Sequence, residues 1–396
     1  MTQMATGPQA GPLAGLRVID CTHVIAGAWC SMILADLGAD VVKVEGPQGD
    51  VARAPIGLHG YANYDYVNRN KRGLMLDLSQ EAGRDALRRL LVTADVFVEN
   101  YRPGAMDRMG LGYAAMSARN PGLVYCSVSG FGNRGPYRNR GGLDLVTQAM
   151  SGIMGFTGQP DGDPMPCALP ISDLNAGSFA AIGVLAALRE RDRSGHGQHV
   201  ETNLLSSAFA YTVNNTGEYL MTGHLPRRTG GRGAYTAPYE AFPTQDGDIV
   251  IGAGTEALWQ RTAAVLDDPV LATDPRFATT PSRLAHHATL RERMIAVLTT
   301  RPRAHWLARL GEAGVPVSPI NSVAEAIDDP QLQELGAVVT VEGRRHIRTP
   351  IDFSRTPVSV TRDAPRLGQH AREVLSEAGF TADEIAALLA GREPTA

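Results

Sequence analysis

The stretch that decides the fold is LRVIDCTHVIAGAWCSMILADLGADVVKVE, residues 16–45. Its two short apolar runs, at 16–20 and 40–45, are each typical of a buried strand. Between them, residues 27–38 have the pattern of a helix that ends at Gly38. Two strands joined by a helix form a crossover unit, so this stretch predicts a parallel sheet covered by helices.

The alternation of strands and helices continues through the first half of the chain. The pattern predicts an amphipathic helix over 79–94, strands over 95–100, 123–129 and 197–205, and a helix over 143–156. A long helix over 173–192 is apolar almost all round, so we expect it to be buried. The predicted fold class is therefore α/β. Ligands of such sheets bind beyond the carboxyl ends of the strands, so the loops after the strands hold the candidate site residues.

Length and composition indicate a multidomain chain. A chain of 396 residues exceeds one ordinary core, which favours two domains. The Gly-, Arg- and Pro-rich segment 222–238 is typical of a linker or an active-site loop, and a smaller α+β region follows it. Near the end of the chain, Thr381 and Glu384 predict a capping box that begins the last helix.

Charge and cysteine usage exclude several classes of protein. The net charge of -4 and the lack of a basic tract argue against nucleic-acid binding. No apolar run reaches the length that spans a bilayer, and the first 15 residues do not resemble a signal peptide. The four cysteines (Cys21, Cys30, Cys126 and Cys167) form no CxxC pair, and no histidine spacing suggests a metal site. We expect a cytoplasmic protein that binds no metal, no nucleic acid and no membrane.

Asp173 lies in PISDLNAG, residues 170–177, between a Pro-rich loop and the long apolar helix. Aspartate is a favoured N-cap, so one interpretation is that Asp173 only begins the helix. The same position suits a nucleophile, because a helix N-terminus favours the charged carboxylate and lowers its basicity. Asp144 is a second candidate, and two carboxylates near one cleft fit acyl chemistry. The pattern alone leaves both roles open.

Three further motifs have weaker implications. GFGNRG at 130–135 matches the dinucleotide fingerprint, but no helix opens inside it, which argues against nicotinamide binding. His23 follows a strand end and is either ligand-facing or satisfied by nearby backbone. The basic residues past strand ends are either solvated or ligands of a polyphosphorylated molecule: Arg69, Lys71, Arg72, Arg102 and Arg108.

Several blocks of the sequence together resemble the family III CoA-transferases. This family includes formyl-CoA transferase, carnitine CoA-transferase and the α-methylacyl-CoA racemases. The blocks are residues 13–50, 68–79, 95–113, 171–177 and 191–201, and the resemblance extends from about residue 12 to residue 370.

The resemblance implies an architecture. Both ends of the chain, residues 1–222 and 330–396, are expected to form a large Rossmann-like, CoA-binding domain. Residues 223–329 are expected to form a smaller α+β domain with its linkers. Two chains of the family interlock, so the resemblance also implies a homodimer.

The resemblance further implies a reaction and its participants. In the transferases the aspartate that matches Asp173 attacks an acyl-CoA thioester, and an anhydride and then an aspartyl-CoA thioester follow. The acceptor carboxylate then takes the CoA. The partners are an acyl-CoA and a small carboxylic acid; CoA and its thioesters are substrates, and no permanently bound cofactor is expected.

The family's CoA contacts match residues in several loops. They fall on Ile25 and Ala26, on Leu76, Asp77, Leu78 and Ser79, on Asn100, Tyr101, Arg102 and Arg108, and on Leu143 and Asp144. Two positions depart from the family pattern. Ile25 stands where some transferases have Gln, and Gly46 stands where some members have Arg.

Leu143 bears on the choice of reaction. The racemases typically have His-Asp where this sequence has Leu143-Asp144, and leucine cannot move a proton. This favours a transferase, with a racemase or a non-catalytic CoA-thioester-binding protein as the alternatives. Residues 230–254 are most similar to members that handle dicarboxylates such as succinate. Arg227, Arg228 and Arg232 are expected either to meet a second carboxylate or to lie in a solvated linker.

Overall fold

The computed structural model describes residues 11–55 and 63–390. The chain forms two units, which we describe separately. Unit 1 comprises Met1–Ile153, Pro166–Gly223 and Gln331–Ala396, and unit 2 comprises Met154–Met165 and His224–Pro330. The assignment of CoA to the larger part of the chain stays a prediction.

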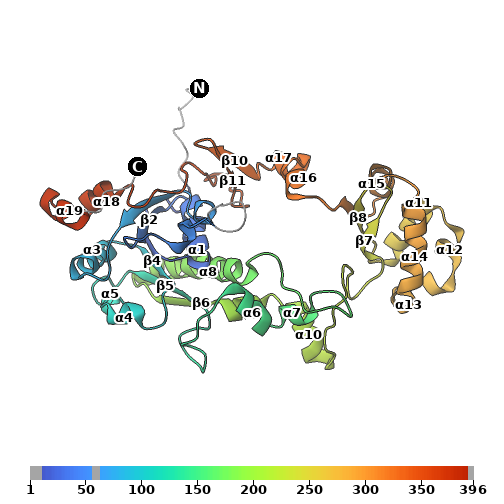
Figure 1. Ribbon diagram of the computed structural model, residues 1–396, viewed down its shortest axis with the longest axis horizontal. Helices are drawn as coiled ribbons and strands as arrows, with labels where there is room; N and C mark the ends of the chain where they lie inside the picture. Colours follow the sequence, from blue (N-terminus) through green and yellow to red (C-terminus); the bar gives the residue numbers. More distant parts are fainter. Residues whose placement is uncertain (1–10, 56–62, 391–396) are drawn as a thin grey trace. The chain divides into compact units, whose positions relative to one another are not determined.

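Unit 1 is built on a six-stranded sheet in which every pairing is parallel (Figure 1). The strands are β1 (Arg17–Cys21), β2 (Asp40–Glu45), β3 (Lys71–Met75), β4 (Val96–Glu99), β5 (Val124–Ser129) and β6 (His199–Asn203). Their order across the sheet is β3-β2-β1-β4-β5-β6. All five predicted strands are present, and the predicted α/β class is confirmed. Only β3 was not predicted.

Two layers of helices cover the sheet. On one face, α1 (Ala26–Asp36) and α8 (Ile171–Ser194) share a core that contains Leu34, Val98 and Val184. On the other face, α3 (Glu81–Val92) and α5 (Tyr113–Ser117) are joined by α18 (Ala371–Glu377) and α19 (Ala382–Leu389) from the far end of the chain (Figure 1). The predicted capping box of Thr381 and Glu384 begins α19 and is confirmed.

Short elements complete unit 1 around this framework. They are η1 (Val51–Arg53), α2 (Tyr64–Val67), α4 (Ala105–Arg108), α6 (Asp144–Met150), α9 (Leu204–Ala210), α10 (Val213–Thr222), α17 (Pro330–Glu334), β10 (Val338–Val341) and β11 (Arg344–Ile347). Helix α7 (Ile153–Phe156) begins at the last residue of the first segment of unit 1 and lies mainly in unit 2. The single helix predicted over 143–156 is wrong. Gly152 has a φ of 93°, which no helix continues through, and therefore α6 and α7 are separate.

Unit 2 contains a three-stranded antiparallel sheet of β7 (Tyr239–Pro243), β8 (Asp248–Gly252) and β9 (Val317–Pro319). The accompanying helices are α11 (Glu256–Leu266), α12 (Pro269–Thr273), η2 (Pro275–Phe277), α13 (Thr280–Ala285), α14 (His287–Leu298), α15 (Arg303–Glu312) and α16 (Val323–Ile327). Phe242, Trp259, Met294 and Trp306 fill the core between sheet and helices. Unit 2 therefore has a hydrophobic core of its own.

Helix α8 is the described helix that is long and apolar enough to cross a membrane. It has 24 residues and a mean hydropathy of 1.5 over its most apolar window, so the expectation that no segment reaches this length is wrong. Half of that window is buried inside the structure. Core helices of soluble proteins meet the same criterion, which makes it weak support for a membrane span.

A buried ionic cluster is formed by side chains of β1, β2 and β3. Asp20, Lys43 and Lys71 have no exposed side-chain surface. Asp20 Oδ2 accepts from Lys71 Nζ at 2.9 Å, and Asp20 Oδ1 lies 3.8 Å from Lys43 Nζ. Burial alone raises the pKa of Asp20, but Lys43 and Lys71 outweigh it and hold that pKa well below its usual value. Burial lowers the pKa of Lys71 to about 8. This cluster joins β1, β2 and β3.

The neighbouring arginines are also paired inside unit 1. Arg69 lies 2.5 Å from Asp36, and Arg72 forms ion pairs with Asp40, Glu373 and Glu377. Lys71 and Arg72 belong to β3 and are buried. The interpretation of Arg69, Lys71 and Arg72 as phosphate ligands is therefore wrong, because their charges balance carboxylates within the fold.

Candidate active site

The predicted CoA contacts gather along one edge of the parallel sheet. Ile25 and Ala26 follow β1, residues 76–79 follow β3, and residues 100–102 follow β4. Parallel strands end at the same edge, and because β1 lies next to β4 the loops after these two strands are neighbours in space. Arg108 ends α4, which follows the β4 loop. The loop of residues 76–79 lies at the same edge but two strands away from β1.

These contacts differ in what they can offer a ligand. The side chains of Ala26 and Leu76 are buried in the core, so only their backbone is available. Ser79, Arg102 and Arg108 are exposed, while Ile25, Asp77, Leu78, Asn100 and Tyr101 are half-buried. At Gly46, a Cβ atom would meet nothing within 4 Å. The space for a larger side chain exists there and this chain leaves it open.

The loop after β1 is clamped in an unusual conformation. Asn100 Oδ1 accepts from the His23 N–H at 2.7 Å, and Asn100 Nδ2 donates to the His23 carbonyl at 2.8 Å. Val24 has a φ of 61°, which a β-branched residue rarely adopts, and its N–H donates to both Asp50 carboxylate oxygens at 3.1 Å. Strained residues of this kind cluster at ligand-binding sites. Both the oxygen and the nitrogen of the Asn100 amide take part in this clamp.

His23 itself faces the second loop. Its ring packs edge-on against Tyr101, with 4.9 Å between the ring centroids. Burial lowers the pKa of His23, with a smaller contribution from Lys43, so the ring is neutral at neutral pH. His23 therefore holds the β1 and β4 loops together through both its backbone and its ring.

Helix α8 approaches this edge through a glycine. A Cβ atom at Gly177 would lie 2.3 Å from the Ala26 carbonyl oxygen, so only glycine allows this contact. Trp29 Nε1 donates to Ser178 Oγ at 3.2 Å beside it. Asp173 precedes Gly177 by four residues and shares its helix face, which places it one turn from the Ile25–Ala26 loop.

Asp173 is the third residue of α8, and Pro170 is the N-cap. The interpretation of Asp173 as the N-cap is therefore wrong, because the helix begins earlier in the chain. Among the described residues, none donates a hydrogen bond to its carboxylate. Burial, together with the nearby charge of Asp144, raises the pKa of Asp173 to about 7. This is opposite to the lowered basicity expected from the helix N-terminus, because desolvation outweighs the helix dipole.

Asp144, not Asp173, accepts a hydrogen bond from a free N–H at the start of α8. It is the first residue of α6, and its Oδ1 accepts from the Ser172 N–H at 2.8 Å. Its Oδ2 accepts from Gln148 Nε2 at 2.7 Å. One carboxylate thus satisfies an orphan N–H of α8 and keeps a second charge close to Asp173. Leu143 is the N-cap of α6 and is 71% exposed, with no titratable group to offer.

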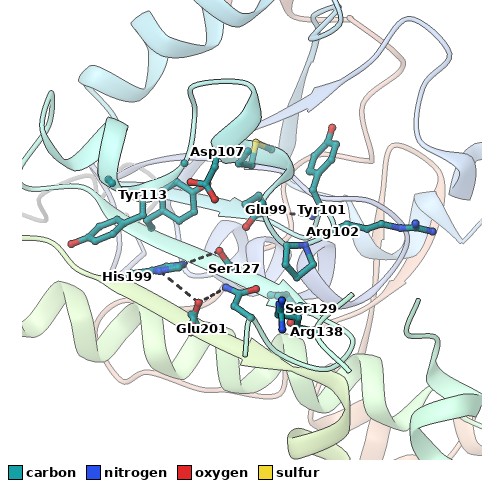
Figure 2. A pocket seen from close by; sticks show the side chains of 18 of the residues that line it. Glu99, Tyr101, Arg102, Asp107, Tyr113, Ser127, Ser129, Arg138, His199 and Glu201 are labelled. Carbon is teal, nitrogen blue, oxygen red and sulfur yellow. Dashed lines mark hydrogen bonds and ion pairs between the residues drawn. The ribbon is translucent and has the colours of Figure 1, made fainter. Parts of the chain in front are cut away.

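A cavity of about 450 Å³ lies beside the β4 loop, at the ends of β4, β5 and β6 (Figure 2). Ser127 Oγ lies 2.9 Å from His199 Nε2, and Glu99 stands next to Ser127 across the sheet. Burial raises the pKa of Glu99 to about 7 and lowers that of His199. Tyr101 and Arg102 line this cavity, although Arg102 points away from His199 (Figure 2).

Sequence reasoning missed most of this cavity. Ser127, His199 and Glu201 alternate with apolar residues along β5 and β6, which is the pattern of one polar strand face. This alternation is visible in the sequence, but it does not distinguish a strand face that binds a ligand from one that faces solvent. Among residues 11–55 and 63–390, no group of three or more His, Cys, Asp or Glu side chains is arranged to hold a metal ion.

Known proteins resemble this chain over nearly its whole length. Residues 13–371 match the family described as CoA-transferase family III. The succinate–glutarate CoA-transferase of Agrobacterium fabrum is 38% identical over 381 residues, which cover 92% of this chain and 95% of that protein. The succinyl-CoA–D-citramalate CoA-transferase of Chloroflexus aurantiacus is 38% identical over 96% of this chain and 98% of its own length.

A solved structure shows the same fold. The crystal structure of a CaiB/BaiF family protein from Brucella suis superposes with a TM-score of 0.87 at 36% identity. The match covers 93% of this chain and all of that one. Sequence, fold and the loops along the sheet edge agree, and the chain belongs to CoA-transferase family III.

Proposed function

We propose that this chain is an acyl-CoA:carboxylate CoA-transferase that uses Asp173 as its nucleophile and dicarboxylates such as succinate or glutarate as its acids. The observation that carries the proposal is the Gly177–Ala26 contact, which brings a carboxylate without hydrogen-bond donors next to the predicted CoA loops. The names of the Agrobacterium and Chloroflexus relatives support the class of acid. CoA and its thioesters are the substrates.

The proposed reaction balances without a further reagent. An Asp173 oxygen attacks the thioester carbon, the C–S bond breaks, and CoA leaves as the thiolate from a mixed anhydride. The thiolate attacks the Asp173 carbonyl carbon, which releases the donor acid and forms an aspartyl-CoA thioester. The acceptor carboxylate attacks this thioester, and the returning thiolate attacks the acceptor carbonyl, which frees Asp173. Two acids exchange one CoA, and no proton is consumed.

The surroundings of Asp173 suit such a nucleophile. A carboxylate with a pKa of about 7 is a stronger base, and therefore a stronger nucleophile, than an ordinary aspartate. The absence of hydrogen-bond donors among the described residues leaves its lone pairs free for attack. With this pKa, the Asp173 carboxyl is protonated in part of the enzyme molecules at neutral pH.

A direct test uses purified enzyme with succinyl-CoA and glutarate, read by mass spectrometry. We expect glutaryl-CoA to form. With a 2-methylacyl-CoA in deuterium oxide, we expect no deuterium at the α-carbon, because Leu143 cannot carry the proton that a racemase must move. Deuterium incorporation without CoA transfer would instead support the racemase alternative. If the protein catalyses neither CoA transfer nor deuterium incorporation with any acid tried, the result would support a CoA-thioester-binding protein.

Asp144 offers a prediction about pH. Since attack requires ionised Asp173, kcat/KM should fall about tenfold per pH unit below pH 7. Asp144→Asn removes a charge that raises the pKa of Asp173, so the acidic limb should move to lower pH. The Asn oxygen can still accept from the Ser172 N–H, which preserves the cap.

The control for this profile is Glu190→Gln, on an exposed turn of the same helix. Seventeen residues separate Glu190 from Asp173, which corresponds to about 25 Å along the helix, so the limb should not move. The prediction is wrong if the acidic limb of the kcat/KM profile does not move in Asp144→Asn, or if it moves equally in the control. Asp144 would then not raise the pKa of Asp173.

The remaining features of the proposal concern assembly and location. We propose a Rossmann-like CoA domain and an interlocked homodimer, as the family resemblance implies. Supporting the dimer, large apolar side chains are exposed on α8, α9, α10 and the turn between α9 and α10: Phe179, Ile182, Phe209, Tyr211, Val213, Leu220 and Met221. The three buried free thiols fit the proposed cytoplasmic location. Light scattering should give twice the mass of one chain.

A further inference from the structure

Unit 2 contains a cavity of its own, of about 450 Å³. It lies where the segment after Thr157 and the Gly-rich segment before β7 meet β7 and α14. Its lining residues are Gln159, Pro160, Thr229, Gly231, Arg232, Glu240, Ala241, His287 and Arg291. Three of these side chains are basic or can become so, and one is acidic.

The single acid in the cavity is already matched. The Glu240 side chain is 4% exposed, and His287 Nε2 lies 2.5 Å from its Oε1. Arg291 pairs with its other oxygen and also donates to the Ala241 carbonyl at 2.7 Å. A buried carboxylate held from two sides is satisfied, and it needs no further cation.

Arg232 is the basic residue of this lining that does not pair with Glu240. Its backbone forms an isolated antiparallel bridge with Glu240, so the two side chains leave the backbone on the same face. Glu240 nevertheless turns to His287 and Arg291. No carboxylate of residues 11–55 and 63–390 forms an ion pair with Arg232, although it is half-buried. A partly desolvated guanidinium without an anion is a binding group that lacks its partner.

The backbone around Arg232 is held in place. The Gly230 N–H donates to the Gly158 carbonyl at 2.9 Å, and the Gly233 N–H donates to the Tyr239 carbonyl at 2.7 Å. Thr229 Oγ1 donates to the Arg232 carbonyl at 2.8 Å. These bonds fix the backbone that carries the Arg232 side chain.

The two neighbouring arginines are less suited to binding an anion. Arg228 donates to backbone carbonyls of Gln159 and Gly155, and Arg227 is exposed and outside the cavity lining. Of the three arginines considered from the sequence, Arg232 is the one that lines this cavity.

We infer that this cavity binds a carboxylate group, and that Arg232 selects dicarboxylates over monocarboxylates as the acid substrate. The inference rests on the proposed function. One carboxylate of a dicarboxylate receives CoA, whereas the other keeps its charge through every step and requires a cation wherever it is desolvated. The cavity of Figure 2 is less suitable, because Asp107 and Glu201 would repel a dianion.

The test compares glutarate with pentanoate, an acid of the same length with one carboxylate. In Arg232→Gln, kcat/KM for glutarate should fall roughly 10- to 100-fold relative to pentanoate, as expected for a lost charge-assisted pair. Arg232→Lys should recover part of the preference, because it keeps the charge without the planar fork. Arg261→Gln, at an exposed position of α11 outside this lining, should leave the ratio unchanged.

Calorimetry with glutarate and CoA-free enzyme provides an independent readout. Binding should be lost in Arg232→Gln and kept in Arg261→Gln. An unchanged ratio, or an equal fall for both acids, overturns the inference while the proposed function stands. If the wild type transfers CoA to neither acid, the proposed function fails, and calorimetry still decides whether Arg232 holds a carboxylate.

Discussion

Asp173→Asn is expected to abolish CoA transfer and, at the same time, to stabilise the folded chain above neutral pH. The amide has nearly the shape of the carboxylate, but it cannot form the anhydride, so we expect a loss of at least about 10³-fold in kcat. CoA binding should persist, because the predicted CoA loops do not include this side chain.

The stability gain follows from the raised pKa. At a pH below the ordinary value of 3.8, Asp173 is protonated in both states and contributes nothing to pH dependence. Between 3.8 and about 7, the unfolded chain releases its proton first, so stability falls as pH rises, and above 7 the full penalty applies. One pKa unit corresponds to 1.36 kcal/mol, so a pKa raised from 3.8 to about 7 gives a penalty of about 4 kcal/mol at pH 8.

Denaturant unfolding at several pH values tests this prediction. Asp173→Asn should exceed the wild type in the free energy of unfolding at pH 8, and the difference should shrink by about half at pH 5. Hydroxylamine with an acyl donor should leave a hydroxamate at residue 173 of the wild type and none in the variant. Near-normal transfer by the variant would show that the mechanism is wrong. A stability difference that does not change with pH would contradict the raised pKa.

Asp20→Asn should cause the largest loss of stability. The change leaves Lys71 and Lys43 fully buried, with Asp50, 3.4 Å from Lys43, as the remaining carboxylate in ion-pair distance. Removing one partner of a buried ionic cluster typically costs about 3–5 kcal/mol, because the other charges remain desolvated. We expect a marked fall in the urea midpoint and in soluble yield.

Two further variants make this prediction specific. Asp85→Asn breaks the ion pair of an exposed carboxylate on α3, and it should cost less than about 1 kcal/mol. The double variant Asp20→Asn with Lys71→Met should recover part of the loss, because it removes an unpaired buried charge. If Asp20→Asn costs no more than Asp85→Asn, the cluster does not contribute as described.

The fold was largely predictable where the chain's own pattern determines it. The strands and helix of residues 16–45 are recognisable because apolar runs and a glycine stop are local signals. Strand β3 was not predicted, because KRGLM begins with two charged residues. Their burial depends on Asp20 and Asp40, which lie on other strands, and no local pattern reports such pairing.

The site was predictable in its residues more than in their roles. The sequence left two roles open for Asp173, and of these the N-cap is wrong, because Asp144 caps α8 from another helix. Asn100 stays a predicted CoA contact, and the structure adds that its amide clamps His23. Both facts depend on contacts between distant segments. The resemblance to a family identified the positions, and only the structure gave the geometry and the shifted pKa values.

The buried cluster also determines how this protein responds to chemical labelling. The chain has two lysines, Lys43 in β2 and Lys71 in β3, and both side chains are fully buried. Lysine-directed crosslinkers, and enzymes that acetylate or ubiquitinate lysine side chains, therefore find no lysine amine to modify on the native surface. Modification of either lysine would report that the sheet of unit 1 has opened. The extent of labelling at Lys43 and Lys71, measured by mass spectrometry, therefore reports local unfolding of unit 1.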